Sequence, residues 1–146
     1  MKLLIVDDCV DIVNILSSLL GFSGHQIQKA QNGIEALELL RNNSYEVVIT
    51  DAEMPGMGGV ELCRFIKSDF PDLYIIGISG SFRSLQELKA AGADICFPKP
   101  FHIDAIEKAI EDRMLSLSLD RYLPVVSNDS GRLIGTGRQS FNGHLF

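Results

Sequence analysis

Five short apolar runs, separated by segments of helical periodicity, organise the chain from residue 2 to about residue 115. The runs are Leu3–Val6, Gln26–Gln28, Val47–Ile49, Tyr74–Ile78 and Ile95–Phe97. Three of them are apolar almost throughout, which is typical of central strands that helices cover on both faces. Strands that alternate with amphipathic helices predict an α/β domain built on a parallel sheet.

Between the runs, apolar residues recur at spacings of three and four, which predicts one buried face on each helix. The five sets are Val10, Val13, Leu16 and Leu20; Ile34, Leu37 and Leu40; Val60, Cys63 and Ile66; Leu85, Leu88 and Ala91; and Ile103, Ile106, Ile110 and Met114. Asn32 followed by Glu35 indicates the start of a helix, and Gly92 indicates the end of one.

Beyond Arg113 the periodicity weakens. Leu115, Leu117 and Leu119 alternate with serines, a pattern that fits either a continuation of the last helix or a short strand. Two short apolar pieces farther on flank a segment rich in Ser, Asn, Asp and Gly, which fits a hairpin, a linker or a disordered tail. We therefore expect one compact domain over residues 1–116 and a C-terminal tail, linker or short hairpin over residues 117–146.

Composition excludes several classes of protein. The net charge of −6 and the pI near 4.9 argue against direct binding to nucleic acid, which needs clustered Lys and Arg. No apolar run approaches the length that a membrane span needs, and acidic residues come too early for a signal peptide, so we expect a cytoplasmic protein without membrane insertion. The three cysteines are far apart and fit neither a disulfide framework nor a zinc site.

Three acidic residues stand at the ends of predicted strands. Asp7 and Asp8 follow the first strand directly, and Asp51 follows the third. A single Asp at a strand end is more often an ordinary cap or turn residue. However, the carboxyl ends of parallel strands meet at one edge of the sheet, so three carboxylates from separate segments would repel one another unless a cation lies among them. Mg²⁺, which prefers oxygen ligands, is the cation that this cluster favours.

Two further polar residues follow later strands. Ser79 comes after the fourth run, and Lys99 comes after the fifth, between Pro98 and Pro100. The plain interpretation is a turn or cap residue for the serine and a solvated surface side chain for the lysine. Beside a carboxylate and a metal, however, an ammonium and a hydroxyl are the groups that neutralise and hydrogen-bond a phosphoryl group.

In this order, the segments resemble the receiver domains of two-component response regulators. The matching pieces are Leu4–Asp8, Ile49–Asp51, Met54–Gly59, Ile78–Gly80, Gly92–Asp94 and Lys99–Phe101. The resemblance covers about residues 2–115. It implies a flavodoxin-like, doubly wound, five-stranded parallel sheet in the order 2-1-3-4-5, with helices on both faces.

The resemblance also implies a phosphorelay function. Asp51 would accept a phosphoryl group from a histidine on a sensor histidine kinase or a histidine phosphotransfer protein. Asp7, Asp8, Asp51 and the backbone carbonyl of Glu53 would hold Mg²⁺. The domain would be a signalling switch that promotes its own phosphorylation and dephosphorylation, and not an enzyme with independent turnover.

Signal output follows from the same resemblance. Lys99 would contact the phosphoryl oxygens, with a cis peptide before Pro100. Ser79 would turn toward the phosphoryl group and carry the change to the face made by the fourth helix, the fifth strand and the fifth helix. This face or the tail would also be the surface for a homodimer.

The sequence departs from the family pattern at the switch position. Cys96 stands where the family commonly has Tyr or Phe, and Phe97 should point to the opposite face of the sheet. Either backbone movement reads the displacement of Ser79, or Phe101 or Phe82 supplies the missing ring. The simpler interpretation is that Cys96 fills a small space. The side chain of Glu53 should lie near the route of the water that ends the phosphorylated state, where it could repel or orient that water.

Two other functions compete with this prediction. A small phosphatase of the haloacid-dehalogenase type also uses an Asp nucleophile with Mg²⁺, but that family has its nucleophile after the first strand and a second Asp two residues on. Here Asp7 and Asp8 are adjacent, and Asp51 is followed by Ala52 and Glu53. A receiver-like interaction module that accepts no phosphoryl group is the other alternative, and the presence of all the expected charged residues counts against it.

Overall fold

The computed structural model describes residues 1–122, 126–127 and 133–134. Strands and helices alternate along the first 120 residues. The elements are β1 (Lys2–Val6), α1 (Val10–Phe22), β2 (Gln26–Ala30), α2 (Gly33–Asn42), β3 (Val47–Asp51), α3 (Gly59–Asp69), β4 (Tyr74–Ser79), α4 (Phe82–Ala91), β5 (Ile95–Pro98), α5 (Ile103–Asp120), β6 (Val126–Ser127) and β7 (Leu133–Ile134). The five expected strands and five expected helices are all present.

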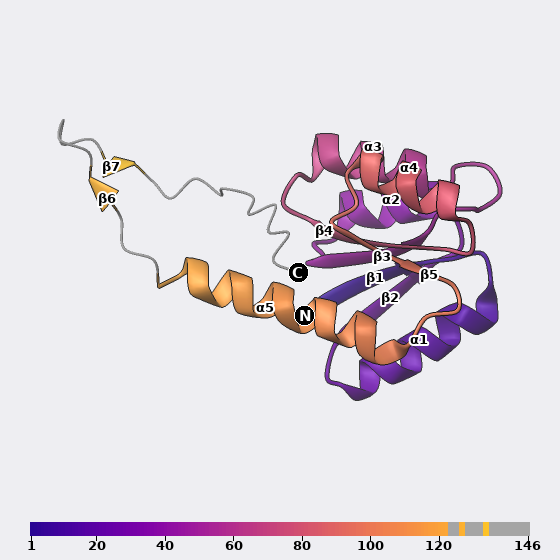
Figure 1. Ribbon diagram of the computed structural model, residues 1–146, viewed down its shortest axis with the longest axis horizontal. Helices are drawn as coiled ribbons and strands as arrows, with labels where there is room; N and C mark the ends of the chain where they lie inside the picture. Colours follow the sequence, from indigo (N-terminus) through magenta and orange to yellow (C-terminus); the bar gives the residue numbers. More distant parts are fainter. Residues whose placement is uncertain (123–125, 128–132, 135–146) are drawn as a thin grey trace. The chain divides into compact units, whose positions relative to one another are not determined.

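The first five strands form one parallel sheet in the order β2-β1-β3-β4-β5, which confirms the predicted topology (Figure 1). β1 pairs with both β2 and β3, and its last residue, Val6, is in register with Thr50. β4 and β5 extend the sheet on the side of β3. The strands that carry the candidate site residues are therefore neighbours, and their carboxyl ends lie at one edge.

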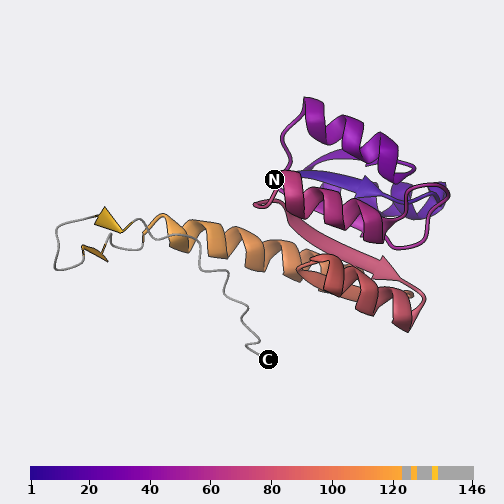
Figure 2. The same cartoon turned by 90° about the horizontal axis from the view of Figure 1, so that it is seen from above.

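Helices cover both faces of this sheet and enclose two separate hydrophobic cores (Figure 1). Seen from above, α2, α3 and α4 lie side by side over one face (Figure 2). The other face packs against α1 and the first turns of α5, through residues such as Leu16 and Ile106. Alternate residues of β1 enter opposite cores, since Leu4 belongs to the first and Ile5 to the second, as the period of a strand requires.

The helix boundaries follow the signals in the sequence. Asn32 Oδ1 accepts a hydrogen bond from the N–H of Glu35, so the predicted cap of α2 is confirmed. Gly92 ends α4 in the left-handed conformation, with φ of 115°, which a glycine adopts without steric cost.

Three residues assigned to buried helix faces are exposed instead: Val10, Ile34 and Met114. Val10 and Ile34 both lie in the first turns of their helices, and Ile34 lies to one side of the buried stripe formed by Gly33, Leu37 and Leu40. Met114 lies near the other end of a long helix, on the last turns of α5.

The chain divides into two compact units, Met1–Glu111 and Asp112–Phe146. Helix α5 continues to Asp120, so Leu115, Leu117 and Leu119 are helical and do not form a strand. In the second unit, β6 and β7 pair antiparallel, with Val126 opposite Ile134. Within the described residues, every helix is too short or too polar to cross a bilayer.

Candidate phosphorylation site

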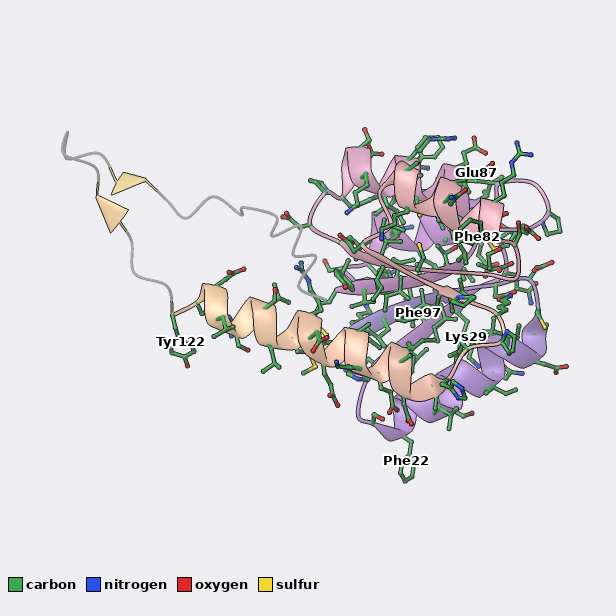
Figure 3. All side chains as sticks on the ribbon, in the orientation of Figure 1. Phe22, Lys29, Phe82, Glu87, Phe97 and Tyr122 are labelled. Atoms are coloured by element: carbon green, nitrogen blue, oxygen red, sulfur yellow. The ribbon has the colours of Figure 1, made fainter. Side chains whose placement is uncertain are left out.

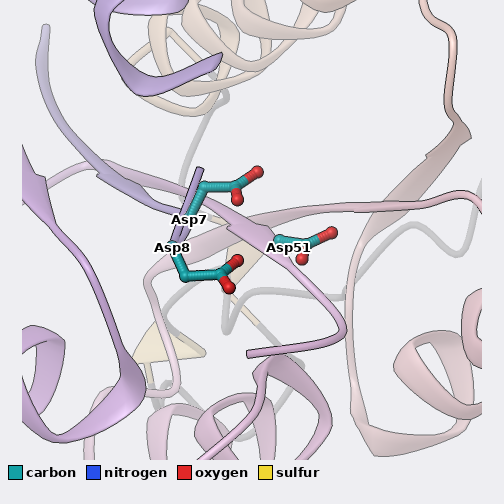
Figure 4. A group of neighbouring side chains, drawn as sticks. All are labelled: Asp7, Asp8 and Asp51. Atoms are coloured by element: carbon teal, nitrogen blue, oxygen red, sulfur yellow. The ribbon is translucent and has the colours of Figure 1, made fainter. Parts of the chain in front are cut away.

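Three carboxylates meet at the carboxyl edge of the central strands. Asp7 directly follows β1, and Asp51 is the last residue of β3, so the pairing of these strands brings the two side chains together. With Asp8, they present oxygen atoms that all lie within 4.8 Å of one another (Figure 4). Asp7 and Asp51 are buried and Asp8 is exposed. This all-oxygen donor set, open to solvent on one side, fits a hard divalent cation that keeps part of its water shell.

Lys99 supplies the positive charge nearest to these acids. Its Nζ lies 3.0 Å from Asp51 Oδ1 and 3.1 Å from Asp7 Oδ2, so one ammonium bridges the ends of β1 and β3. The peptide bond between Lys99 and Pro100 is cis, as expected. The N–H of Lys99 donates to the carbonyl oxygen of Ser79 at 2.9 Å, which ties the residue to the end of β4.

Burial and the hydrogen bond between Lys99 and Asp51 have opposite effects on the pKa values of these two residues. Burial raises the pKa of Asp51 above its ordinary value, and the charge of Asp7 adds to this effect, although the hydrogen bond from Lys99 opposes it. Partial burial alone would lower the pKa of Lys99, but its hydrogen bonds to Asp51 and Asp7 outweigh that effect and raise it. The surroundings therefore stabilise the charged form of Lys99. They stabilise the charged form of Asp51 only in part.

Ser79 is the last residue of β4 and is almost fully buried, with 1% of its surface exposed. Its Oγ accepts a hydrogen bond from the N–H of Ser81 at 3.0 Å. Ser81 in turn caps α4, because its Oγ accepts from the N–H of Ser84 at 3.3 Å. The hydroxyl of Ser79 is thus engaged with the start of α4.

Glu53 lies in the segment between β3 and α3, two residues after Asp51. Its side chain extends to α4, where Glu53 Oε1 accepts a hydrogen bond of 2.8 Å from Ser84 Oγ. Sequence reasoning missed this contact. The two residues are 31 positions apart and belong to no shared motif, so only the path of the loop brings them together.

Close backbone packing fixes the loop after β3. The N–H of Gly59 donates to the carbonyl oxygen of Ala52 at 2.9 Å. A Cβ atom on Gly59 would lie 1.9 Å from the carbonyl oxygen of Asp51, so only glycine fits at this position. Gly56, with φ of 73°, turns the loop back toward α3. The Gly-rich segment that follows Asp51 therefore shapes the backbone directly behind the site.

The candidate switch residues lie in different places. Cys96 is half-buried in the core beneath α2, α3 and α4, whereas Phe97 packs in the core on the opposite face, as the strand period predicts. Phe101 also packs against the second core. Phe82, in the first turn of α4, is 76% exposed (Figure 3). None of these three rings lies in the core that contains Cys96, where an aromatic switch residue would be expected.

Helix α1 carries a second apolar face that the sequence analysis overlooked. Ile15, Leu19 and Phe22 are exposed, and Phe22 projects into solvent with 96% of its surface accessible (Figure 3). With Ile12, they follow a helical spacing of three and four. Ile12 and Ile15 line a pocket together with Lys99, Pro100 and Phe101. An apolar surface therefore adjoins the acidic cluster. The sequence could have predicted it, because α1 has apolar residues at helical spacing on two sides.

Known proteins share both the sequence pattern and the fold. The family described as the response regulator receiver domain matches residues 3–111. Response regulator MprA of Mycobacterium sp. strain KMS is 37% identical over 108 residues, which cover 72% of this chain and 46% of that protein. This chain therefore spans about half the length of such relatives. Sporulation initiation phosphotransferase F of Bacillus subtilis is 33% identical over 129 residues, which cover 87% of this chain and 97% of that protein.

Solved structures agree with these matches. The chemotaxis response regulator CheY4 of Vibrio cholerae superposes with a TM-score of 0.71 at 29% identity, covering 77% of this chain and 97% of the other. Response regulator TrrA of Thermotoga maritima, solved in complex with Mg²⁺-BeF, superposes with a TM-score of 0.72 at 31% identity, again covering 77% and 97%. The family match covers most of the chain, and the sheet order is the one that the family has. This chain belongs to the response-regulator receiver family.

Proposed function

We propose that the domain is a phosphoacceptor in a two-component phosphorelay and that Asp51 takes the phosphoryl group. The observation that carries this proposal is the position of Lys99 Nζ, 3.0 Å from Asp51 and 3.1 Å from Asp7 within a cluster of three carboxylates. An ammonium and an oxygen-lined cation site around one nucleophilic carboxylate are the groups that phosphoryl transfer requires.

In the proposed reaction, a carboxylate oxygen of Asp51 attacks the phosphorus of a phosphohistidine. The bond between phosphorus and the ring nitrogen breaks, and the electron pair stays on the histidine. The ammonium of Lys99 is already held beside Asp51 by their ion pair. From this position it can also neutralise the oxygens of the transferred phosphoryl group.

We assign Mg²⁺ to Asp7, Asp8 and Asp51, together with the backbone carbonyl of Glu53. The oxygen-only donor set supports this assignment, as does the Mg²⁺-BeF bound by the similar regulator TrrA. When bound, the ion neutralises the repulsion among the carboxylates and screens the approaching phosphoryl group. Burial and the charge of Asp7 together raise the pKa of Asp51, and Lys99 offsets only part of this effect.

The donor would dock on the apolar surface beside the site. The pocket lined by Ile12, Ile15 and Phe101 shares Lys99 with the phosphorylation site, so a partner seated there is close to Asp51. A sensor histidine kinase or a histidine phosphotransfer protein is the partner that supplies a phosphohistidine. The word phosphotransferase in the name of the Bacillus subtilis relative is in line with such a relay.

Output and assembly follow as further proposals. Ser79 would release the N–H of Ser81 and donate a hydrogen bond from its hydroxyl to a phosphoryl oxygen, which alters the start of α4. The face of α4, β5 and α5 would read this change and would serve a homodimer, and α4 begins with the exposed ring of Phe82. We expect such a switch to act in the cytoplasm and to promote only its own modification.

Intact-mass measurement tests the assignment of Asp51. After incubation with acetyl phosphate and Mg²⁺, the protein should gain the mass of one phosphoryl group, and EDTA should prevent the gain. Asp51→Asn should abolish it, because the nucleophile is lost, while Asp69→Asn on the exposed end of α3 should not. An Asp51→Asn protein that still gains the mass would disprove the assignment. Steady release of inorganic phosphate from a phosphate monoester would instead favour the phosphatase alternative.

A further inference from the structure

The side chain of Glu53 is held by the first turn of α4. Ser84 Oγ donates a hydrogen bond of 2.8 Å to Glu53 Oε1, which links the segment after β3 to a helix 31 residues farther along the chain. Glu53 is two residues from Asp51, so this bond reaches the immediate neighbourhood of the proposed phosphoacceptor. The oxygens that gather at the cation site come from Asp7, Asp8 and Asp51, and Glu53 is not among the side chains of that cluster.

The same hydrogen bond is the last of three that connect Ser79 to Glu53. The N–H of Ser81 donates to Ser79 Oγ at 3.0 Å, the N–H of Ser84 donates to Ser81 Oγ at 3.3 Å, and Ser84 Oγ then donates to Glu53. Ser84 uses its backbone for one bond and its side chain for the next. A displacement of Ser79 would therefore pass through the start of α4 to the carboxylate of Glu53.

Electrostatics favour the observed position of Glu53. The amino end of α4 carries the positive end of the helix dipole, which stabilises a nearby carboxylate. A further negative charge among Asp7, Asp8 and Asp51 would instead be repelled. Both effects support the hydrogen bond to Ser84, and both would change when a phosphoryl group and its cation occupy the site.

We propose that Ser84 is a positioning residue that prolongs the phosphorylated state by holding the carboxylate of Glu53 on α4. This inference rests on the proposed function of Asp51. The phosphorylated state ends when a water oxygen attacks phosphorus, the bond between phosphorus and the Asp51 oxygen breaks, and its electron pair returns to the carboxylate. A Glu53 carboxylate released from Ser84 can orient the attacking water, and the proton that this water loses passes to the solvent. While Ser84 occupies Oε1, the side chain is restrained from this role.

The rate at which the phosphoryl group is lost tests the proposal. The protein is phosphorylated with acetyl phosphate and Mg²⁺, the donor is removed, and intact mass is followed over time. Ser84→Ala should lose the group about threefold to tenfold faster, as expected for the loss of one hydrogen bond. Ser84→Thr keeps a hydroxyl at the same position and should decay at the wild-type rate. Ser68→Ala, an exposed serine on α3, is the matched control and should leave the rate unchanged.

Repeating the measurement in a Glu53→Ala protein separates the proposed positioning role of Ser84 from a purely structural one. In Glu53→Ala the carboxylate is absent, so adding Ser84→Ala should have no further effect on the decay rate. An unchanged or slower decay in Ser84→Ala, or an equal acceleration with and without Glu53, would overturn the proposal. A wild-type protein that gains no phosphoryl mass would be a different result, because it would refute the proposed function and this inference with it.

Discussion

At the scale of single residues, the site depends on a carboxylate that is costly to bury. Asp51 is only 7% exposed, and its surroundings raise its pKa even though Lys99 donates to it. Such a group destabilises the folded chain when it is ionised and no cation is present. The cost has a functional use, because a bound cation can relieve it.

Asp51→Asn should therefore stabilise the protein in the absence of divalent cations. A raised pKa in the folded state means that the wild-type free energy of unfolding falls as pH rises from the ordinary value of 3.8 through the folded value. The amide does not titrate, so its advantage should grow across this window and stay constant above it. Urea unfolding in EDTA at pH 4 and at pH 7.5 measures the difference, with Asp69→Asn as control. The advantage should shrink when Mg²⁺ is added, and an Asp51→Asn protein no more stable than wild type at pH 7.5 in EDTA would contradict this prediction.

The sequence was informative where function depends on strand ends. Asp7, Asp51 and Lys99 could be expected to meet, because each ends or follows a strand of one parallel sheet, and the structure brings them together. The bond between Glu53 and Ser84 could not be foreseen, since it depends on the path of a loop and on side-chain rotamers. The consequence of Cys96 was also open. The half-buried position of its side chain is compatible with the simple filling of space.

At the scale of elements, the segment between β3 and α3 couples the fold to the site. Gly59 begins α3 against the carbonyl oxygen of Asp51, and its N–H bonds to Ala52. The position of the nucleophile thus depends on a helix start that admits no side chain. The apolar spacing of Val60, Cys63 and Ile66 predicted this helix, but its glycines gave no sign of how closely the two segments approach.

Gly59→Ala should destabilise the protein by about 3 kcal/mol, since the added methyl group must displace the backbone of Asp51. Phosphoryl uptake should fall with it, because the carboxylate moves. Urea unfolding and intact mass measure the two effects. Gly21→Ala on α1 is the matched control: its nearest neighbour would be 4.0 Å away, and it should leave stability unchanged or raise it by up to about 1 kcal/mol. Equal stability of the two variants would show that the close approach has no energetic consequence.

At the scale of the molecule, two separate cores stabilise one sheet, and the sequence predicted this arrangement well. Apolar strands mark a sheet that is covered on both faces, and strand order followed from the resemblance to receiver domains. Helix faces were predicted less accurately, as exposed Val10 and Ile34 show, because apolar spacings of three and four fix the buried stripe of a helix only approximately. The boundary predicted at residue 116 falls within α5, which continues to Asp120.

A fragment of residues 1–120 should fold, and it should gain a phosphoryl group to the same extent as the whole chain. Two solved receiver structures align over 97% of their own length with 77% of this chain, which supports an autonomous first unit. Its free energy of unfolding should lie within about 0.5 kcal/mol of the full value. Light scattering on both forms would also test self-association through the tail, because an unchanged oligomeric mass would eliminate that role. A fragment that does not fold cooperatively would refute the proposed domain boundary.

The edge of the sheet that β5 forms has one further consequence. β5 is the last strand in the order, has four residues and ends at Pro98, which has no N–H to offer to a neighbouring strand. Short edge strands that contain proline resist the addition of another chain. Continuous sheets across two copies of this domain are therefore disfavoured on this side, and any pairing of copies there would have to use the flanking helices.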